Sequence, residues 1–131
     1  MTRKSGFTFI ELLVSVTIIL VISTFALVSF RSANKKARDD RRAADLEQIR
    51  AALELYRVDY DTYPAALVTL TEGSEPYLSV VPDDPVSGLD YYYNQISDYS
   101  YEVCAYLEST DPGTCSAGCG EENCNYKLRN P

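Results

Sequence analysis

The sequence predicts an α+β fold in which a long N-terminal helix, half membrane-spanning and half amphipathic, packs on a small antiparallel sheet. Three observations lead to this prediction. Residues 7–30 are almost entirely apolar, residues 31–62 continue with a helical period and no Gly or Pro, and residues 99–108 alternate between apolar and other side chains. The chain of 131 residues has room for one domain after such a helix.

The apolar run is long enough to cross a bilayer. Residues 7–30 contain one charged side chain, Glu11, and as a helix they would extend about 36 Å. A cleavable secretory signal is the alternative, with Thr24, Phe25 and Ala26 as a poor cleavage site. That alternative is disfavoured because the run is too long for a signal and carries a carboxylate. We therefore expect a transmembrane helix.

The sequence gives conflicting indications of the orientation of this run in the membrane. Only Arg3 and Lys4 precede it, whereas six basic residues follow: Arg31, Lys35, Lys36, Arg38, Arg41 and Arg42. Counting positive charges would place the C-terminal side in the cytoplasm. The cysteines and the acidic remainder of the chain favour the opposite orientation.

The composition excludes several classes of function. The chain has no histidine, which removes histidine-based catalysis and every histidine-containing metal site. Residues 58–131 carry two basic and thirteen acidic side chains, so this half would repel nucleic acid. We expect no enzyme and no direct nucleic-acid partner.

The second half of the helix carries one apolar stripe. Its members recur at intervals of three and four residues: Leu46, Ile49, Leu53, Tyr56 and Tyr60. Charged side chains, including Arg42 and Asp45, are assigned to the rest of the helix surface. The helix is expected to end near Thr62, because Pro64 disfavours helical backbone at Tyr63.

Residues 63–131 are expected to form a globular head. A turn cluster runs from Pro82 to Gly88, and residues 99–107 read as a half-buried strand in a hairpin that turns through Gln95 to Asp98. The apolar side chains of this strand are Tyr99, Tyr101, Val103, Ala105 and Leu107. They are expected to cover the helical stripe.

Four cysteines lie within the last 28 residues: Cys104, Cys115, Cys119 and Cys124. Outside the membrane an even number implies disulfides, and three connectivities exist. We favour the pairs 104–115 and 119–124, which close short loops, over the nested pairs 104–124 and 115–119. A zinc or iron-sulfur site is disfavoured because the C-x-x-C pairs typical of such sites are missing.

The segment from Lys4 to Val14 resembles the processing signal of type IV prepilins and type II secretion pseudopilins. In that family prepilin peptidase cuts after a glycine and methylates the new N-terminal residue. The resemblance implies cleavage between Gly6 and Phe7, methylation of Phe7, and pairing of Glu11 with the N-terminal amine of a neighbouring subunit. It also implies a cytoplasmic N-terminus with the head outside. Unlike many members, this chain has no Pro or Gly within residues 7–30.

The head resembles that of major pseudopilins, from Tyr60 to Pro64 and again through the turn cluster to Tyr93. The resemblance implies a pilin-like fold with a short loop and helix before the sheet. Major pseudopilins hold calcium in a C-terminal loop, but the cysteine tail does not match that loop. Asp111, Glu121 and Glu122 are therefore not assigned as ligands, and no cofactor is expected apart from a possible calcium ion.

Together these features predict a structural subunit, a pilin or pseudopilin. The domains are a cleaved leader (1–6), a membrane and filament-core helix (7–30), an amphipathic helix (31–62) and a head (63–131). The partners implied are copies of itself, other pilins or pseudopilins, prepilin peptidase and a membrane assembly platform. The subunit would be a single-pass membrane protein and later part of a periplasmic or extracellular filament.

An alternative from a different class of protein is a membrane-anchored extracytoplasmic binding or redox domain. The glycine before Phe7 distinguishes the two, because an ordinary anchor has no need of it. The resemblance leaves open whether the filament serves a pilus, DNA uptake or secretion, and whether the subunit is major or minor.

Overall fold

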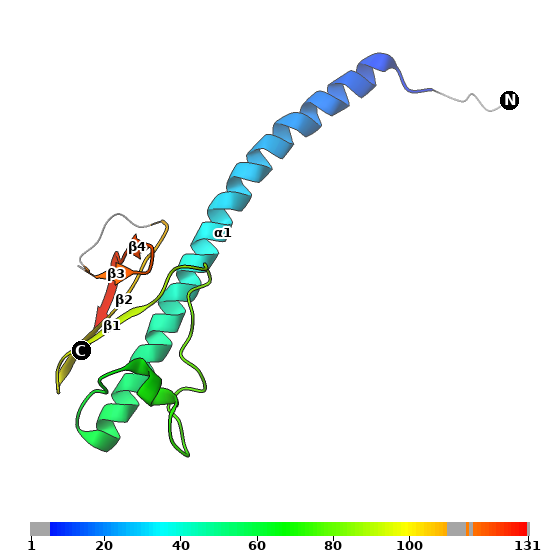
Figure 1. The fold of residues 1–131 in the computed structure, drawn as a ribbon. Helices are drawn as coiled ribbons and strands as arrows, with labels where there is room; N and C mark the ends of the chain where they lie inside the picture. Colours follow the sequence, from blue (N-terminus) through cyan, green and yellow to red (C-terminus); the bar gives the residue numbers. More distant parts are fainter. Residues whose placement is uncertain (1–5, 110–114, 116, 131) are drawn as a thin grey trace. The chain divides into compact units, whose positions relative to one another are not determined.

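A computed structural model of the chain describes residues 6–109, 115 and 117–130. Its main element is helix α1, Phe9–Tyr60, which confirms the predicted long helix (Figure 1). The chain divides into two compact units, residues 1–35 and 36–131, and the boundary falls within this helix.

The first unit presents its apolar side chains to the surroundings. Leu13 is 46% exposed, and exposure rises to 80% at Phe9. The most apolar window of α1 has a mean hydropathy of 2.6, so the helix is long and apolar enough to cross a membrane. The hydroxyls of Thr17 and Thr24 donate to carbonyls one turn earlier, at 3.1 Å to Leu13 and 2.9 Å to Leu20. These bonds satisfy polar groups that lipid would leave without a partner.

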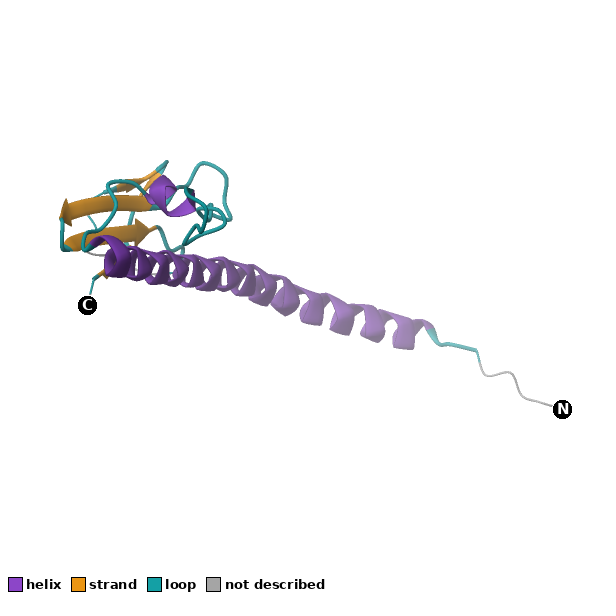
Figure 2. Ribbon diagram, turned by 90° about the horizontal axis from the view of Figure 1, so that it is seen from below, coloured by secondary structure: helices purple, strands orange, loops and turns teal. Residues whose placement is uncertain are grey.

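The second unit, residues 36–131, is called the head from here on and contains two small antiparallel sheets beside the helix. The larger sheet has the order β1-β2-β5, formed by Tyr92–Ser97, Ser100–Ala105 and Tyr126–Arg129. The smaller pairs β3, Gly118–Cys119, with β4, Glu122–Asn123. A 3-10 helix, η1, occupies Leu67–Thr71. Figures 1 and 2 show the strands along the C-terminal part of α1, which confirms the predicted α+β fold.

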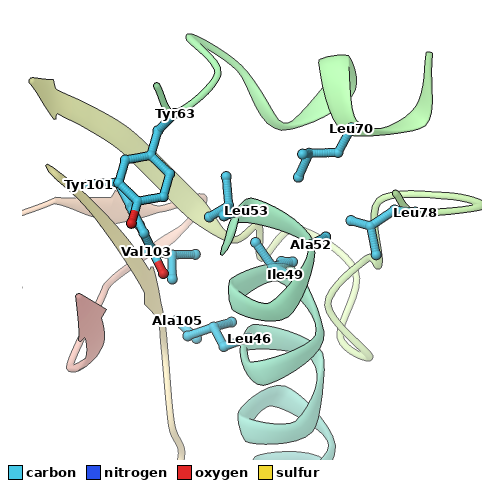
Figure 3. Close-up of a cluster of buried hydrophobic side chains, with 10 residues drawn as sticks. All are labelled: Leu46, Ile49, Ala52, Leu53, Tyr63, Leu70, Leu78, Tyr101, Val103 and Ala105. Carbon is cyan, nitrogen blue, oxygen red and sulfur yellow. The ribbon is translucent and has the colours of Figure 1, made fainter. Parts of the chain in front are cut away.

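The core lies where the helical stripe meets the central strand. Leu46, Ile49 and Leu53 of α1 are fully buried, as are Tyr101, Val103 and Ala105 of β2. Figure 3 shows these side chains between the helix and the strand, with Leu70 of η1 and Leu78 closing another side. The predicted contact between strand and stripe is confirmed. Tyr60 is a correction: it is 60% exposed and stacks on Tyr56 at the edge of the core.

Helix α1 ends at Tyr60, slightly before the expected position. Asp61 has a φ of 56°, the left-handed conformation that commonly follows a helix. Its backbone N–H donates to the carbonyl of Arg57 at 2.8 Å, which satisfies one of the last helical carbonyls. The backbone conformation of Asp61 therefore ends the helix before Pro64 has any influence.

The hairpin turn lies later than predicted. The turn residues are Asp98 and Tyr99, whereas Gln95 belongs to β1 and pairs with Tyr101. The side-chain amide of Gln95 donates to the carbonyl of Tyr63 at 2.8 Å, which holds this part of β1 against the loop after the helix. The register shift falls between Gln95 and Ser97. Tyr99 therefore sits at the turn and is 56% exposed instead of facing the core.

We expect Leu53→Ala to lower the free energy of unfolding of the head by about 2 to 5 kcal/mol, because the truncation leaves a cavity in a filled core. Urea unfolding of the full chain in detergent micelles would measure this. All tyrosines lie from Tyr56 onward, so near-ultraviolet circular dichroism of tyrosine reports the head alone.

Leu55→Ala is the matched control, because Leu55 lies two residues away on α1 and is 57% exposed. It should change the unfolding free energy by less than about 0.5 kcal/mol. Equal effects of the two substitutions would contradict the assigned core.

Candidate functional site

The segment before helix α1 is exposed and open. Gly6 and Phe7 precede the helix, and Phe7 is 90% exposed. No atom outside its own chain neighbours lies within 4 Å of the position that a Cβ on Gly6 would occupy. The peptide bond between these residues is therefore accessible. The leader residues 1–5 lie outside the described residues.

Glu11 forms a capping box with Thr8 at the helix N-terminus. The backbone N–H and hydroxyl of Thr8 donate to Glu11 Oε2 at 2.9 and 2.7 Å, and the N–H of Glu11 donates back to Thr8 Oγ1 at 3.3 Å. The positive end of the helix dipole favours a carboxylate at this position. The capping box thus places Glu11, the one carboxylate of the apolar run, close to the exposed segment of Gly6 and Phe7.

A second charged site lies in the head and is centred on Arg42, whose side chain is fully buried. Its guanidinium contacts Asp84 through two hydrogen bonds, at 2.7 Å from Nε and 2.9 Å from Nη2. Nη1 donates to Asp39 at 2.9 Å and to Glu108 at 3.1 Å. Arg38 holds Glu108 from its other side, at 2.6 and 2.7 Å. We call these five residues the Arg42 cluster.

The Arg42 cluster joins three parts of the chain. Arg38, Asp39 and Arg42 belong to α1, Asp84 lies in the turn cluster, and Glu108 follows β2. Asp39 also accepts hydrogen bonds from the backbone N–H groups of Glu108 and Ser109, both at 2.9 Å, and from the Ser109 hydroxyl. The helix is thereby fixed to both loops by charged hydrogen bonds.

The surroundings of these groups stabilise their charged forms. Burial alone raises the pKa of Asp39, but the hydrogen bonds from Ser109 and the backbone outweigh it and hold that pKa below its ordinary value. The hydrogen bonds from Arg38 likewise lower the pKa of Glu108, against the opposing effect of burial. Burial disfavours the charge on Arg42, yet its contacts with Asp84 raise its pKa overall.

The cysteine tail covers the outer face of β2. Cys104 is bonded to Cys115 with a Cα–Cα distance of 6.6 Å, and Cys119 to Cys124 with one of 5.2 Å. These are the two pairs that the short loops between the cysteines favour. All four side chains are buried together, with Tyr92 and Tyr106 packed against them. Cys104 alternates with the core-facing residues of the predicted half-buried strand, but the tail buries it, so β2 is covered on both faces at this position.

The tail docks on the turn cluster through two glycines. The N–H of Glu121 donates to the carbonyl of Gly88 at 3.0 Å. Gly120 has a φ of 75°, and a Cβ at this position would lie 2.2 Å from the same carbonyl oxygen. Glycine is therefore required at position 120 both by the backbone conformation and by the close approach.

The described residues contain no group of three His, Cys, Asp or Glu side chains arranged to hold a metal ion. Glu121 and Glu122 are exposed in the tail hairpin, whereas Asp111 lies outside the described residues. A calcium site thus stays a prediction that these residues do not test.

Two family models match the chain. Residues 1–27 match the prokaryotic N-terminal methylation motif, and residues 30–118 match protein G of the type II secretion system. The chain belongs to the type II secretion protein G family. Members of this family are pseudopilins, so the chain is a structural subunit of pseudopilin or pilin type, and its apolar helix anchors it in a membrane. The methylation motif implies processing by prepilin peptidase.

The relatives include both pseudopilins and a pilin. The type II secretion system core protein G of Vibrio cholerae serotype O1 is 30% identical over 106 residues, covering 71% of this chain and 72% of the relative. That of Klebsiella pneumoniae is 29% identical over an alignment of 132 residues, covering 85% and 93%. A type IV wide pilus major component of Thermus thermophilus is 33% identical over 79 residues, covering 58% and 60%. No solved structure matches the chain significantly.

Sequence reasoning missed two residues of these two sites, and a signal existed for each. Thr8 stands three residues before Glu11, which is the spacing of a capping box. Arg42 was assigned to the polar surface, yet it precedes Leu46 by four residues and so lies in line with the apolar stripe. A charge in that register indicates a buried ion pair.

We expect Arg42→Met to lower the free energy of unfolding of the head by about 3 to 5 kcal/mol, because it leaves Asp84 and Asp39 buried without their cation. Arg41→Met is the control, since Arg41 is 64% exposed and lies 3.9 Å from Asp45. It should cost less than about 1 kcal/mol. Tyrosine circular dichroism during urea unfolding measures both, and similar losses would refute the role of Arg42.

Acid should destabilise the head through Asp39 and Glu108. Both have a lower pKa in the folded head than in the unfolded chain, so the unfolded state takes up protons first. Their contribution is present above about pH 4, near their unfolded pKa values, and is lost as the pH falls through the folded values.

Asp39→Asn should therefore lower stability at neutral pH and flatten the loss of stability below about pH 4. Urea unfolding midpoints measured across this pH range would give the slope of stability against pH. Asp40→Asn, at an exposed neighbouring position, is the control and should keep the slope of the unmodified chain. An unchanged slope in Asp39→Asn would contradict the assignment.

Proposed function

We propose that this chain is a major subunit of a type II secretion pseudopilus, cut between Gly6 and Phe7, methylated at Phe7 and assembled through residues 7–30. The observation that carries the proposal is the arrangement at the start of α1. An exposed glycine-phenylalanine bond is followed directly by a capping box that places Glu11 at the N-terminus of an apolar helix.

The accessible bond between Gly6 and Phe7 supports processing at this point. Prepilin peptidase would meet an exposed chain that has not yet entered the helix. Cleavage turns the amide of Phe7 into an ammonium group four residues before Glu11. The paired cysteines support a head outside the cytoplasm, because disulfides persist in oxidising compartments. The N-terminus would then be cytoplasmic and the filament periplasmic.

The exposed apolar side chains support assembly into a filament. Lipid covers them while the subunit is in the membrane, and once it is extracted only other apolar helices could do so. In such a bundle the ammonium of one subunit would pair with Glu11 of its neighbour. A subunit out of register would leave a carboxylate unpaired in low dielectric, at a cost of about 3 to 5 kcal/mol.

The protein G relatives favour the secretion filament over a pilus, and the Thermus pilus component is the main reason to keep the pilus as the alternative. The further partners in this proposal are prepilin peptidase, an assembly platform in the membrane and minor pseudopilins. Each of them would act on the membrane-inserted subunit.

We expect Glu11→Ala to be inserted and cleaved normally but to form at least about tenfold fewer filaments, because the N-terminal ammonium loses its partner. Intact mass spectrometry of the membrane-extracted protein measures processing. The expected product lacks residues 1–6, carries one added methyl group, and gains on reduction the four hydrogens that two disulfides take up. Electron microscopy measures filament yield.

Ser15→Ala is the matched control, since its hydroxyl only donates within the same helix, to the carbonyl of Leu12 at 2.9 Å. It should assemble normally. Normal filament yield from Glu11→Ala would refute the pairing role. An uncut chain in a host with prepilin peptidase would refute the proposed processing at Gly6 and the assembly that depends on it.

A further inference from the structure

The basic residues of α1 beyond the apolar run fall into two groups. From Arg38 onward each has a partner within the chain: Arg38 contacts Glu108, Arg41 Asp45, Arg42 three carboxylates, Arg50 Glu47, and Arg57 Tyr63. Arg31, Lys35 and Lys36 are exposed and make no hydrogen bond or ion pair with any described residue. We call these three residues the basic collar.

In the proposed topology the basic collar would lie at the depth of lipid headgroups. If the hydrocarbon ends at Phe30, the rise of the helix places Arg31 about 2 Å and Lys36 about 9 Å beyond it. The headgroup layer is about 5 to 8 Å thick on each side of a bilayer, and charges act over a further 8 Å in physiological salt. Long basic side chains also reach back toward the headgroups along their apolar stems.

The spacing brings these charges together. Arg31 and Lys35 are four residues apart and share one face of the helix, and Lys36 is one residue further along, about 100° around the helix axis from Lys35. Of the two carboxylates that follow, Asp39 is already held by Arg42 and by backbone N–H groups. Asp40 is the exposed carboxylate next along the helix, so the segment keeps a net positive charge.

In the proposed topology the positive charge of the basic collar disfavours insertion of the helix in the required orientation. Basic residues beside a membrane helix favour the cytoplasmic side, yet the collar would lie on the opposite side. A specific anionic partner on that side would explain a feature that insertion itself disfavours.

We propose that Arg31, Lys35 and Lys36 bind the phosphate groups of anionic phospholipids in the leaflet that faces the head. The inference rests on the membrane topology of the proposed function. Lipid phosphates fit better than an acidic protein surface because the three charges lie within about 8 Å along the axis, at headgroup depth. The collar would hold the subunit in the membrane, and extraction into a filament would break these contacts.

The test uses the full processed chain in bilayers of phosphatidylcholine with a minority of phosphatidylglycerol. Native mass spectrometry of the gently released protein counts the lipids that stay bound. We expect the fraction of phosphatidylglycerol among the bound lipids to be about fivefold higher than its fraction in the bilayer. This factor corresponds to the interaction of roughly one lysine with an anionic membrane surface. High salt should reduce the excess, because the interaction is screened.

Replacing the collar with Arg31→Gln, Lys35→Gln and Lys36→Gln should bring bound phosphatidylglycerol down to its share of the bilayer. The matched control removes three other exposed positive charges, with Arg41→Gln, Arg50→Gln and Arg129→Gln. The nearest of these lies about 16 Å beyond Phe30, outside the headgroup layer, so the control should keep the excess.

Enrichment that survives in the collar variant, or that is missing from the unmodified chain, would overturn the proposal. A collar variant that binds lipid like the unmodified chain but fails to form filaments would assign the collar to the acidic surface of a neighbouring copy instead. Failure of the unmodified chain to insert would refute the proposed function itself, an outcome that insertion assays separate from loss of lipid selectivity.

Discussion

The buried guanidinium of Arg42 is the interaction on which the arrangement of the head depends. It donates hydrogen bonds to carboxylates of the helix, the turn cluster and the loop after β2, which are far apart in sequence. An ion so far from water is stable only when every partner is in place. The apolar contacts of Leu46, Ile49 and Leu53 favour packing of the sheet on the helix, but hydrophobic burial is not directional. The charged hydrogen bonds of the Arg42 cluster are directional and fix the position of the loops along the helix.

The same physical problem, a charge in a region of low dielectric, occurs twice along one helix and has two different solutions. Arg42 finds its counter-ions within its own chain, which makes the head a self-sufficient unit. Among the residues that the structure describes, Glu11 accepts hydrogen bonds from the hydroxyl and N–H of Thr8, which satisfy its oxygen but do not balance its charge. A charge balanced inside the chain stabilises the fold, and in the proposed filament a charge left for another subunit to balance would direct assembly.

The fold could be predicted from the sequence where periodicity reports burial directly. The apolar run indicates a membrane helix by its length, the stripe from Leu46 to Leu53 has the period of a helix, and the alternation through Tyr101 and Val103 has the period of a strand. The hairpin turn was misplaced because Gln95 is held in β1 by a bond to Tyr63, a tertiary contact that leaves no local signal. Arg42 and Cys104 were misplaced for a related reason: their burial depends on Asp84 and on the disulfide tail, which other parts of the chain supply.

The uninterrupted backbone of α1 has a mechanical consequence. From Phe9 to Tyr60 no Pro removes a hydrogen bond and no Gly lowers the cost of leaving the helical conformation. Each residue that unwinds would lengthen from about 1.5 to about 3.3 Å, but breaking the first turn inside a continuous helix is costly in an apolar surrounding. Under tension such a helix behaves as a stiff element, and extension would start at its ends or at contacts between subunits. A fibre built on this helix would transmit a pull along its length instead of absorbing it.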